Sequence, residues 1–246
     1  MREWLLDLAR ADAHVTAAAL VGGAAAGRED EWSDIDLALR LADGTDPVAV
    51  ATDWSAALRA RLPVVDQLDI WSGGALFRVF LLADTLQVDV SFWPGPEFAA
   101  TGGEAFRLVF GETNPPTSLT VPAARDLVGR GWLYALHVRS SLARGRSWQA
   151  LHMINGLRDQ VIELACARHG LPVAQGRGVD GLPAPVKDSL RQTLTGSLDH
   201  DQLHLAFGRL ADALLIEAGH VDTTLTARLT DPLWELIRTS RIDPAR

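Results

Sequence analysis

The spacing of hydrophobic and polar residues changes near residue 120. Before that point, short runs alternate between apolar and polar side chains, a period of two that is typical of strands with one buried face. After it, apolar residues recur every three or four positions over long stretches, which is typical of amphipathic helices. The pattern therefore predicts an α/β first part and a helical second part.

The first part is expected to contain two helices and five strands. The helices are predicted at 2–14 and 47–62, and the strands at 17–22, 34–41, 64–71, 75–83 and 86–93. Pro47 suits the first turn of a helix, and Asp46 before it is a candidate N-cap. Residues 83–85, Ala-Asp-Thr, supply the turn between the last two strands.

The stretch 112–126, ETNPPTSLTVPAARD, contains three prolines, which predict an interruption of regular structure. We place a first domain at 1–120 and a second at 121–246. Helices are expected at 123–143, 147–169, within 178–194, at 197–219 and around 230–240. The predicted fold class is α+β, with a small mixed-sheet domain followed by a C-terminal bundle of four or five helices.

Composition and charge narrow the class of protein. Apolar residues make up 48% of the 246 residues, enough for a buried core. The apolar stretch at 17–26 is too short to span a membrane, and no signal peptide is evident at the start, so we expect a cytoplasmic protein.

The net charge of −8 is unevenly distributed. Residues 1–120 hold 8 basic and 18 acidic side chains, a net of −10, whereas residues 121–246 hold 15 and 13, a net of +2. This balance argues against duplex nucleic acid as a partner of the first part. It favours metal ions and cationic substrates.

Two acids share one face of the strand predicted at 34–41. Asp34 and Asp36 project from it roughly 7 Å apart, while the alternate positions are apolar. Asp89 is a lone acid on the strand LQVDVSFW, and it would join the other two if the strands pair. Mg²⁺ takes carboxylates together with phosphate oxygens, so the three acids predict a site for Mg²⁺ and a nucleotide.

Two glycines after the strand at 17–22 complete this prediction. A Gly22-Gly23 step lets backbone N–H groups approach a phosphate closely. Arg28 and Ser33, in the loop between the glycines and the acids, are further candidates for nucleotide binding.

Three residues are candidates for binding the second substrate. Trp93 shares the strand face of Asp89 and can stack on a ring. His152 and Asn155 lie on one polar stripe of a predicted helix, which faces either solvent or a substrate.

The segment VGGAAAGREDEWSDIDLALR, with the later strand acid, resembles the nucleotidyltransferase superfamily typified by DNA polymerase β. Within it, the chain is most similar to bacterial aminoglycoside and lincosamide nucleotidyltransferases. The resemblance implies a catalytic domain at 1–120 and an acceptor-binding bundle at 121–246. It also implies that Asp34 and Asp36 bind Mg²⁺ and that Asp89 is the third ligand or the general base. The family usually has Gly-Ser where this chain has Gly22-Gly23.

The expected activity is Mg²⁺-dependent transfer of a nucleoside monophosphate, AMP from ATP, to a hydroxyl of a small acceptor. The acceptor is expected to be aminoglycoside-like or lincosamide-like, and the acidic first part favours a cationic one. Two alternatives remain open at this point: a protein- or RNA-modifying nucleotidyltransferase of the antitoxin type, and a nucleotide-binding module without turnover. The sequence leaves the oligomeric state open.

Overall fold

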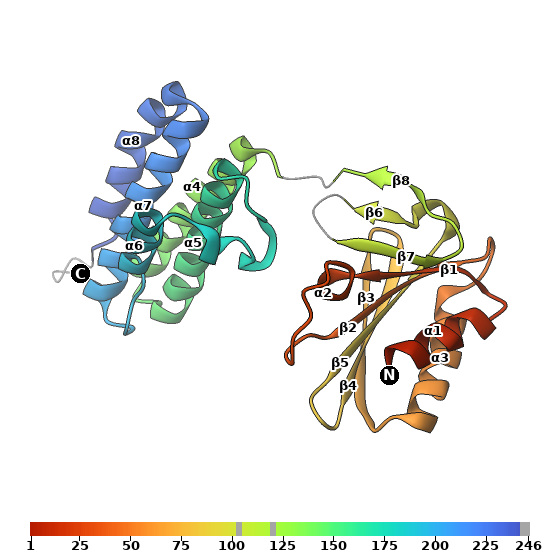
Figure 1. Cartoon of the computed structure of the whole chain (residues 1–246). Helices are drawn as coiled ribbons and strands as arrows, with labels where there is room; N and C mark the ends of the chain where they lie inside the picture. Colours follow the sequence, from red (N-terminus) through yellow and green to blue (C-terminus); the bar gives the residue numbers. More distant parts are fainter. Residues whose placement is uncertain (102–104, 119–121, 242–246) are drawn as a thin grey trace. The chain divides into compact units, whose positions relative to one another are not determined.

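The computed structural model describes residues 1–101, 105–118 and 122–241, and it divides the chain into two compact units, Met1–Leu119 and Thr120–Arg246. The first unit combines a sheet with helices, and the second is helical (Figure 1). The predicted α+β class is thus confirmed. The expected boundary between residues 120 and 121 lies outside the described residues.

The first unit is built on a mixed sheet. Its helices are α1 (Arg2–Ala11), α2 (Gly22–Ala25) and α3 (Pro47–Arg61), and its strands are β1 (Val15–Val21), β2 (Ile35–Leu41), β3 (Val64–Ser72), β4 (Ala75–Leu82), β5 (Gln87–Trp93), β6 (Ala99–Thr101), β7 (Phe106–Phe110) and β8 (Asn114–Thr117). Six strands pair in the order β3-β4-β5-β2-β1-β7. The β2–β5 pair is parallel, and the other neighbouring pairs of this sheet are antiparallel.

One face of the sheet forms the core of the first unit. The apolar positions of β2, among them Leu37 and Leu39, pack there with α1 and α3, which cover this face (Figure 1). Leu5 of α1 and Trp54 of α3 are buried against the same cluster. The strand alternation therefore leaves the opposite side chains of β2, including Asp36, on the other face.

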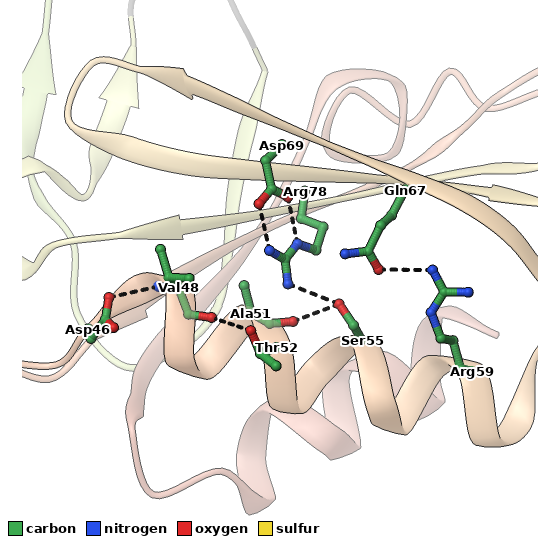
Figure 2. Close-up of polar contacts among 9 residues, drawn as sticks. All are labelled: Asp46, Val48, Ala51, Thr52, Ser55, Arg59, Gln67, Asp69 and Arg78. Carbon is green, nitrogen blue, oxygen red and sulfur yellow. Dashed lines mark hydrogen bonds and ion pairs between the residues drawn. The ribbon is translucent and has the colours of Figure 1, made fainter.

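Helix α3 begins where the sequence predicts. The Asp46 side chain accepts a hydrogen bond from the Val48 amide at 3.0 Å, and Pro47 occupies the first turn (Figure 2). This cap satisfies a donor that has no partner within the helix.

An ion pair made by a buried arginine ties the β3–β4 hairpin to α3 (Figure 2). The Arg78 side chain of β4 is 6% exposed, and it donates two hydrogen bonds of 2.6 Å to the Asp69 carboxylate on β3. Arg78 also donates to the Ser55 hydroxyl on α3 at 3.0 Å, and Ser55 donates to the Ala51 carbonyl. Bidentate geometry and the third partner compensate for the desolvation of the guanidinium.

The sequence missed the strands β6, β7 and β8. The prediction that prolines interrupt regular structure at residues 115 and 116 is wrong, because both lie in β8. Among the residues that the structure describes, this strand pairs with β6 through the positions Asn114 and Thr117, so the missing proline N–H groups cost no ladder bonds there.

The first helix ends earlier than predicted, at Ala11 rather than at residue 14. Asp12 has an extended backbone, with φ −82° and ψ 116°, and its carboxylate accepts the His14 amide at 2.9 Å. This local bond competes with the helix, and β1 starts directly afterwards at Val15.

The described part of the second unit contains five α-helices and two short 3-10 helices, Ala174–Gly176 and Val179–Gly181. The α-helices are α4 (Ala124–Ala143), α5 (Ser147–Arg168), α6 (Ala184–Gln192), α7 (His200–Val221) and α8 (Thr223–Arg238). Glycines allow close packing: a Cβ at Gly156 of α5 would lie 2.3 Å from the Tyr134 ring of α4, and one at Gly131 would lie 2.7 Å from Leu214 of α7. None of the described helices is both long and apolar enough to cross a membrane.

The last helix begins well before the predicted range of 230–240. The Asp222 carboxylate accepts hydrogen bonds from the Thr224 and Leu225 amides and starts α8 at Thr223. Pro232 lies inside this helix without ending it. The N-cap therefore decides the start of the helix, whereas the sequence pattern located only its second half.

The Asp69–Arg78 pair predicts an acid-sensitive contribution to stability. Hydrogen bonds from Arg78 lower the pKa of Asp69. Its stabilisation is therefore present above the ordinary aspartate pKa of about 3.9 and is lost as the pH falls through the lowered value. Asp69→Asn should lower the free energy of unfolding at pH 7 by about 1–3 kcal/mol in urea titrations. Solvent screening limits the loss to this range, because 38% of the Asp69 side chain is exposed.

The difference from the wild type should shrink below about pH 4. Asp188→Asn is the matched control, because Asp188 pairs with Arg191 on an exposed face and this change should cost less than about 0.5 kcal/mol. Equal losses in the two variants would contradict the structural role given to the buried guanidinium.

Candidate metal centre

Three carboxylates converge on the face of the sheet opposite α1 and α3. Asp36 of β2 and Asp89 of β5 are direct register partners across the parallel strand pair, and Asp34 lies just before β2. One oxygen from each of the three lies within 4.8 Å of the others. The strands expected at 34–41 and 86–93 thus pair in the register that brings the acids together, and their metal-binding and catalytic roles stay predictions.

Asp89 has an environment that suits a cation. Its Oδ1 atom is buried and has no hydrogen-bond partner, while Oδ2 accepts from the side-chain Nε2 of Gln87 at 3.2 Å. Burial raises the pKa of Asp89, the Gln87 hydrogen bond opposes that rise, and the negative charge of Asp34 adds to it. A buried anionic oxygen without a donor is costly, and a bound cation would remove that cost.

The donor set also fits the predicted ion. Hard divalent cations such as Mg²⁺ prefer oxygen ligands, and Mg²⁺ commonly uses one or two carboxylates together with phosphate oxygens. Asp34, Asp36 and Asp89 supply oxygens only, and all three are half-buried, so solvent and substrate can still reach them.

Gly22 is required by the position of Asp36. Its φ is +62°, and a Cβ at this residue would lie 2.6 Å from Asp36 Oδ2. The Gly22 amide donates to the Ala105 carbonyl at 3.1 Å, which extends the pairing of β1 with β7. Gly22 therefore provides space and backbone conformation at the acids, and its N–H is already used within the protein.

Gly23 lies in a more open position. The nearest atoms to a Cβ there are the Arg28 carbonyl oxygen and Ser33 Oγ, both at 3.8 Å. Together with Gly22 it forms the first half of α2, the short helical turn that follows β1. A side chain at residue 23 would fit without displacing the loop.

The loop from α2 to β2 is organised by its own side chains. The Ser33 hydroxyl donates to the Asp30 carboxylate and accepts the Asp30 amide, both at 2.9 Å. The Arg28 amide donates to the Gly23 carbonyl, and residue 28 is exposed. The structure places Arg28 and Ser33 beside the glycine turn, and nucleotide binding by either remains a prediction.

The sequence analysis did not identify a second arginine, Arg107, that lies near the glycine turn α2. Arg107 of β7 places its Nη2 atom 3.5 Å from the carbonyl oxygen of Ala24, in α2. No strand was predicted around residue 107, so no pattern connected this side chain with the glycines.

The three predicted acceptor residues lie on two elements, Trp93 on β5 and His152 with Asn155 on α5. Trp93 donates from its indole nitrogen to Ser91 Oγ at 2.8 Å, and its ring makes an edge-on contact with Phe77. His152 and Asn155 are exposed on α5, and the Asn155 amide oxygen accepts from Arg158 at 2.6 Å. Substrate binding by these three residues stays a prediction.

No protein-family model matches the chain, and no curated protein matches its sequence. Among solved structures, a similar chain is that of an aminoglycoside 6-adenyltransferase from Bacillus subtilis. The alignment covers 94% of this chain and 95% of that chain, with 13% sequence identity and a TM-score of 0.42. A likeness this distant says nothing of activity or substrate.

The surroundings of the two glycines predict that an alanine is harmful at residue 22 and tolerated at residue 23. Gly22→Ala should displace the Asp36 carboxylate and lower the free energy of unfolding by about 1–3 kcal/mol, since it adds a clash and a strained backbone. Titration with Mn²⁺ should show affinity weakened by about tenfold or more.

Gly23→Ala is the matched control, because its Cβ has ordinary contacts. Both stability and Mn²⁺ affinity should stay near the wild-type values. Unchanged Mn²⁺ binding in a folded Gly22→Ala variant would show that Asp36 does not depend on this glycine.

Proposed function

We propose that this protein is a Mg²⁺-dependent nucleotidyltransferase that moves a nucleoside monophosphate, AMP from ATP, onto a hydroxyl of a small acceptor. The observation that carries the proposal is the convergence of Asp34, Asp36 and Asp89 within 4.8 Å, with a buried Asp89 oxygen that lacks a partner. The glycine turn α2 next to these acids supports it, because such turns suit phosphate groups.

The three acids have two kinds of role in the proposed reaction. Asp34 and Asp36 would hold the divalent cation, which supplies charge stabilisation for the attacking and leaving oxygens when bound. Asp89 would be the third ligand or would accept the proton of the acceptor hydroxyl. Its burial favours both, because a poorly solvated carboxylate gains from a cation and from a proton.

The bonds change in a single displacement at the α-phosphorus. The acceptor oxygen forms a bond to phosphorus, and the bond from phosphorus to the oxygen bridging the α- and β-phosphates breaks. Pyrophosphate leaves, and the hydroxyl proton passes to Asp89 or to solvent. The acceptor ends as a phosphodiester of the nucleoside monophosphate.

The acids predict a sharp loss of activity on substitution. Asp34→Asn, Asp36→Asn and Asp89→Asn should each lower Mg²⁺-dependent pyrophosphate release by about a hundredfold or more, because each removes a charge from the site. The assay uses ATP with a panel of aminoglycosides, lincosamides and other hydroxylated acceptors.

Asp53→Asn serves as the control. Asp53 is exposed on α3, on the core side of the sheet, and its variant should stay within about twofold of the wild type. Full activity in Asp34→Asn would remove the mechanism. Mg²⁺–ATP binding without turnover for any acceptor would instead indicate a binding module.

Gly23→Ser should strengthen nucleotide binding. Residue 23 has room for the side chain, and a hydroxyl there adds a donor for the terminal phosphates. The KM for ATP should fall by about three- to tenfold with kcat little changed. An unchanged or raised KM would indicate that the new hydroxyl bonds to Ser33 Oγ and does not face the nucleotide.

A further inference from the structure

The face of the sheet that carries the acids is covered on one flank. Small residues on β1 and β2, Ala17, Ala19 and Ala38, are buried there in one cluster with Phe98, which is 1% exposed. Half-buried Phe106 and Trp93 pack against the same cluster. A substrate therefore has no access to the sheet surface over this part of β1 and β2.

The other flank is open and apolar. The register places Val79 of β4 beside Asp89 and Leu68 of β3 beside Val79, all on one face. We define the apolar strip as the β3 and β4 side chains on this face, namely Leu68, Ile70, Phe77, Val79 and Leu81. Leu68 is 60% exposed, and Ile70 and Leu81 are each 46% exposed.

The strip begins directly at the acids. Neighbouring strands lie about 4.8 Å apart, so Val79 is roughly 5 Å and Leu68 roughly 10 Å from Asp89 across the sheet. Among the described residues of β3 and β4, Asp66 is the acid on this face, at the far end beside Leu81. Apart from Asp66, the β3 and β4 side chains on this face therefore offer contact to apolar groups and no charged partner for a cation.

The geometry of the proposed reaction indicates which of the two substrates, the nucleotide or the acceptor, lies over β4 and β3. The attacking and leaving oxygens of a phosphoryl displacement are roughly in line. The glycine turn follows β1, on the far side of β2 from β5. In the proposed function this turn holds the terminal phosphates, so pyrophosphate would leave toward the β1 side. The attacking hydroxyl must then arrive from the β5 side, above β4 and β3.

We propose that the apolar strip holds the body of the acceptor, and that the acceptor is a small hydroxylated molecule with an apolar group rather than a polycation. This inference rests on the proposed nucleotidyl transfer. The strip has five side chains, whereas a stable protein interface uses about 20–30 residues per partner, so its size fits a small molecule.

The test compares two sugar probes that share a hydroxylated ring. Hexyl β-D-glucoside carries an apolar tail, and glucosamine carries a cation. Binding of each to the full chain is measured by NMR titration with Mg²⁺ and α,β-methylene-ATP, which cannot transfer its nucleotide. The apolar probe should bind at least about tenfold more tightly than glucosamine, in line with the burial of several methylene groups.

Variants assign that binding to the strip. Leu68→Ser and Ile70→Ser should each weaken hexyl glucoside binding by about fivefold or more, because each removes an apolar side chain that the bound probe would cover. Leu194→Ser is the matched control: Leu194 is 61% exposed in the second unit, and its variant should bind the probe like the wild type.

Several results would overturn the assignment. They are glucosamine binding as tightly as the apolar probe, no binding of hexyl glucoside, or equal weakening by Leu194→Ser. A dimer that Leu68→Ser dissociates in light scattering would assign the strip to a second copy. Weaker nucleotide binding in Leu68→Ser would assign it to the base.

The same samples separate this inference from the proposed function. If Mg²⁺ and the ATP analogue bind, and Asp34→Asn abolishes that binding, a failed probe experiment rejects only the acceptor site. If the analogue does not bind to the wild type, the nucleotidyl transfer itself is rejected, and the acceptor assignment falls with it.

Discussion

The parallel pairing of β2 with β5 is the constraint on which the candidate site depends. It sets Asp36 directly opposite Asp89, and Asp34 joins them with oxygens within 4.8 Å. Two full charges at about this distance repel by roughly 3 kcal/mol at an effective dielectric constant of 20. A cation bound between these carboxylates would relieve that repulsion, which is not small beside a domain stability of about 5–15 kcal/mol. The pairing of β2 with β5 thus holds three carboxylates together, and a bound cation would balance their charge.

The apolar core and the mutually repelling carboxylates lie on opposite faces of the sheet. Its core face packs apolar β2 residues under α1 and α3, and the acids lie on the opposite face, where solvent reaches them. The Arg78–Asp69 pair and Ser55 fasten the β3–β4 hairpin from the core side (Figure 2). The strip over these strands can therefore stay uncovered without loss of order, because its strands are anchored from behind.

Much of this architecture follows from local rules. Alternation predicted β2 to β5, and Asp46 with Pro47 predicted the start of α3. The same rules missed β6 and β8, because strands of three and four residues carry too little pattern. They also placed the start of α8 too late, because one Asp222 side chain decided it. A helix end that is set by a single side-chain hydrogen bond leaves no trace in the periodic pattern of apolar residues.

By itself, the sequence determined that Asp34 and Asp36 share one face, since the period of a strand is a local property. It also indicated Asp89 as a third acid with the same apolar flanks. Only the tertiary structure decided that β5 pairs with β2 in this register and that Gly22 must lack a Cβ beside Asp36. It also decided that the apolar side chains of Val79 and Leu68 lie next to Asp89 across the neighbouring strands. The reason is physical: strand order and register depend on long-range packing, which no short stretch of sequence encodes.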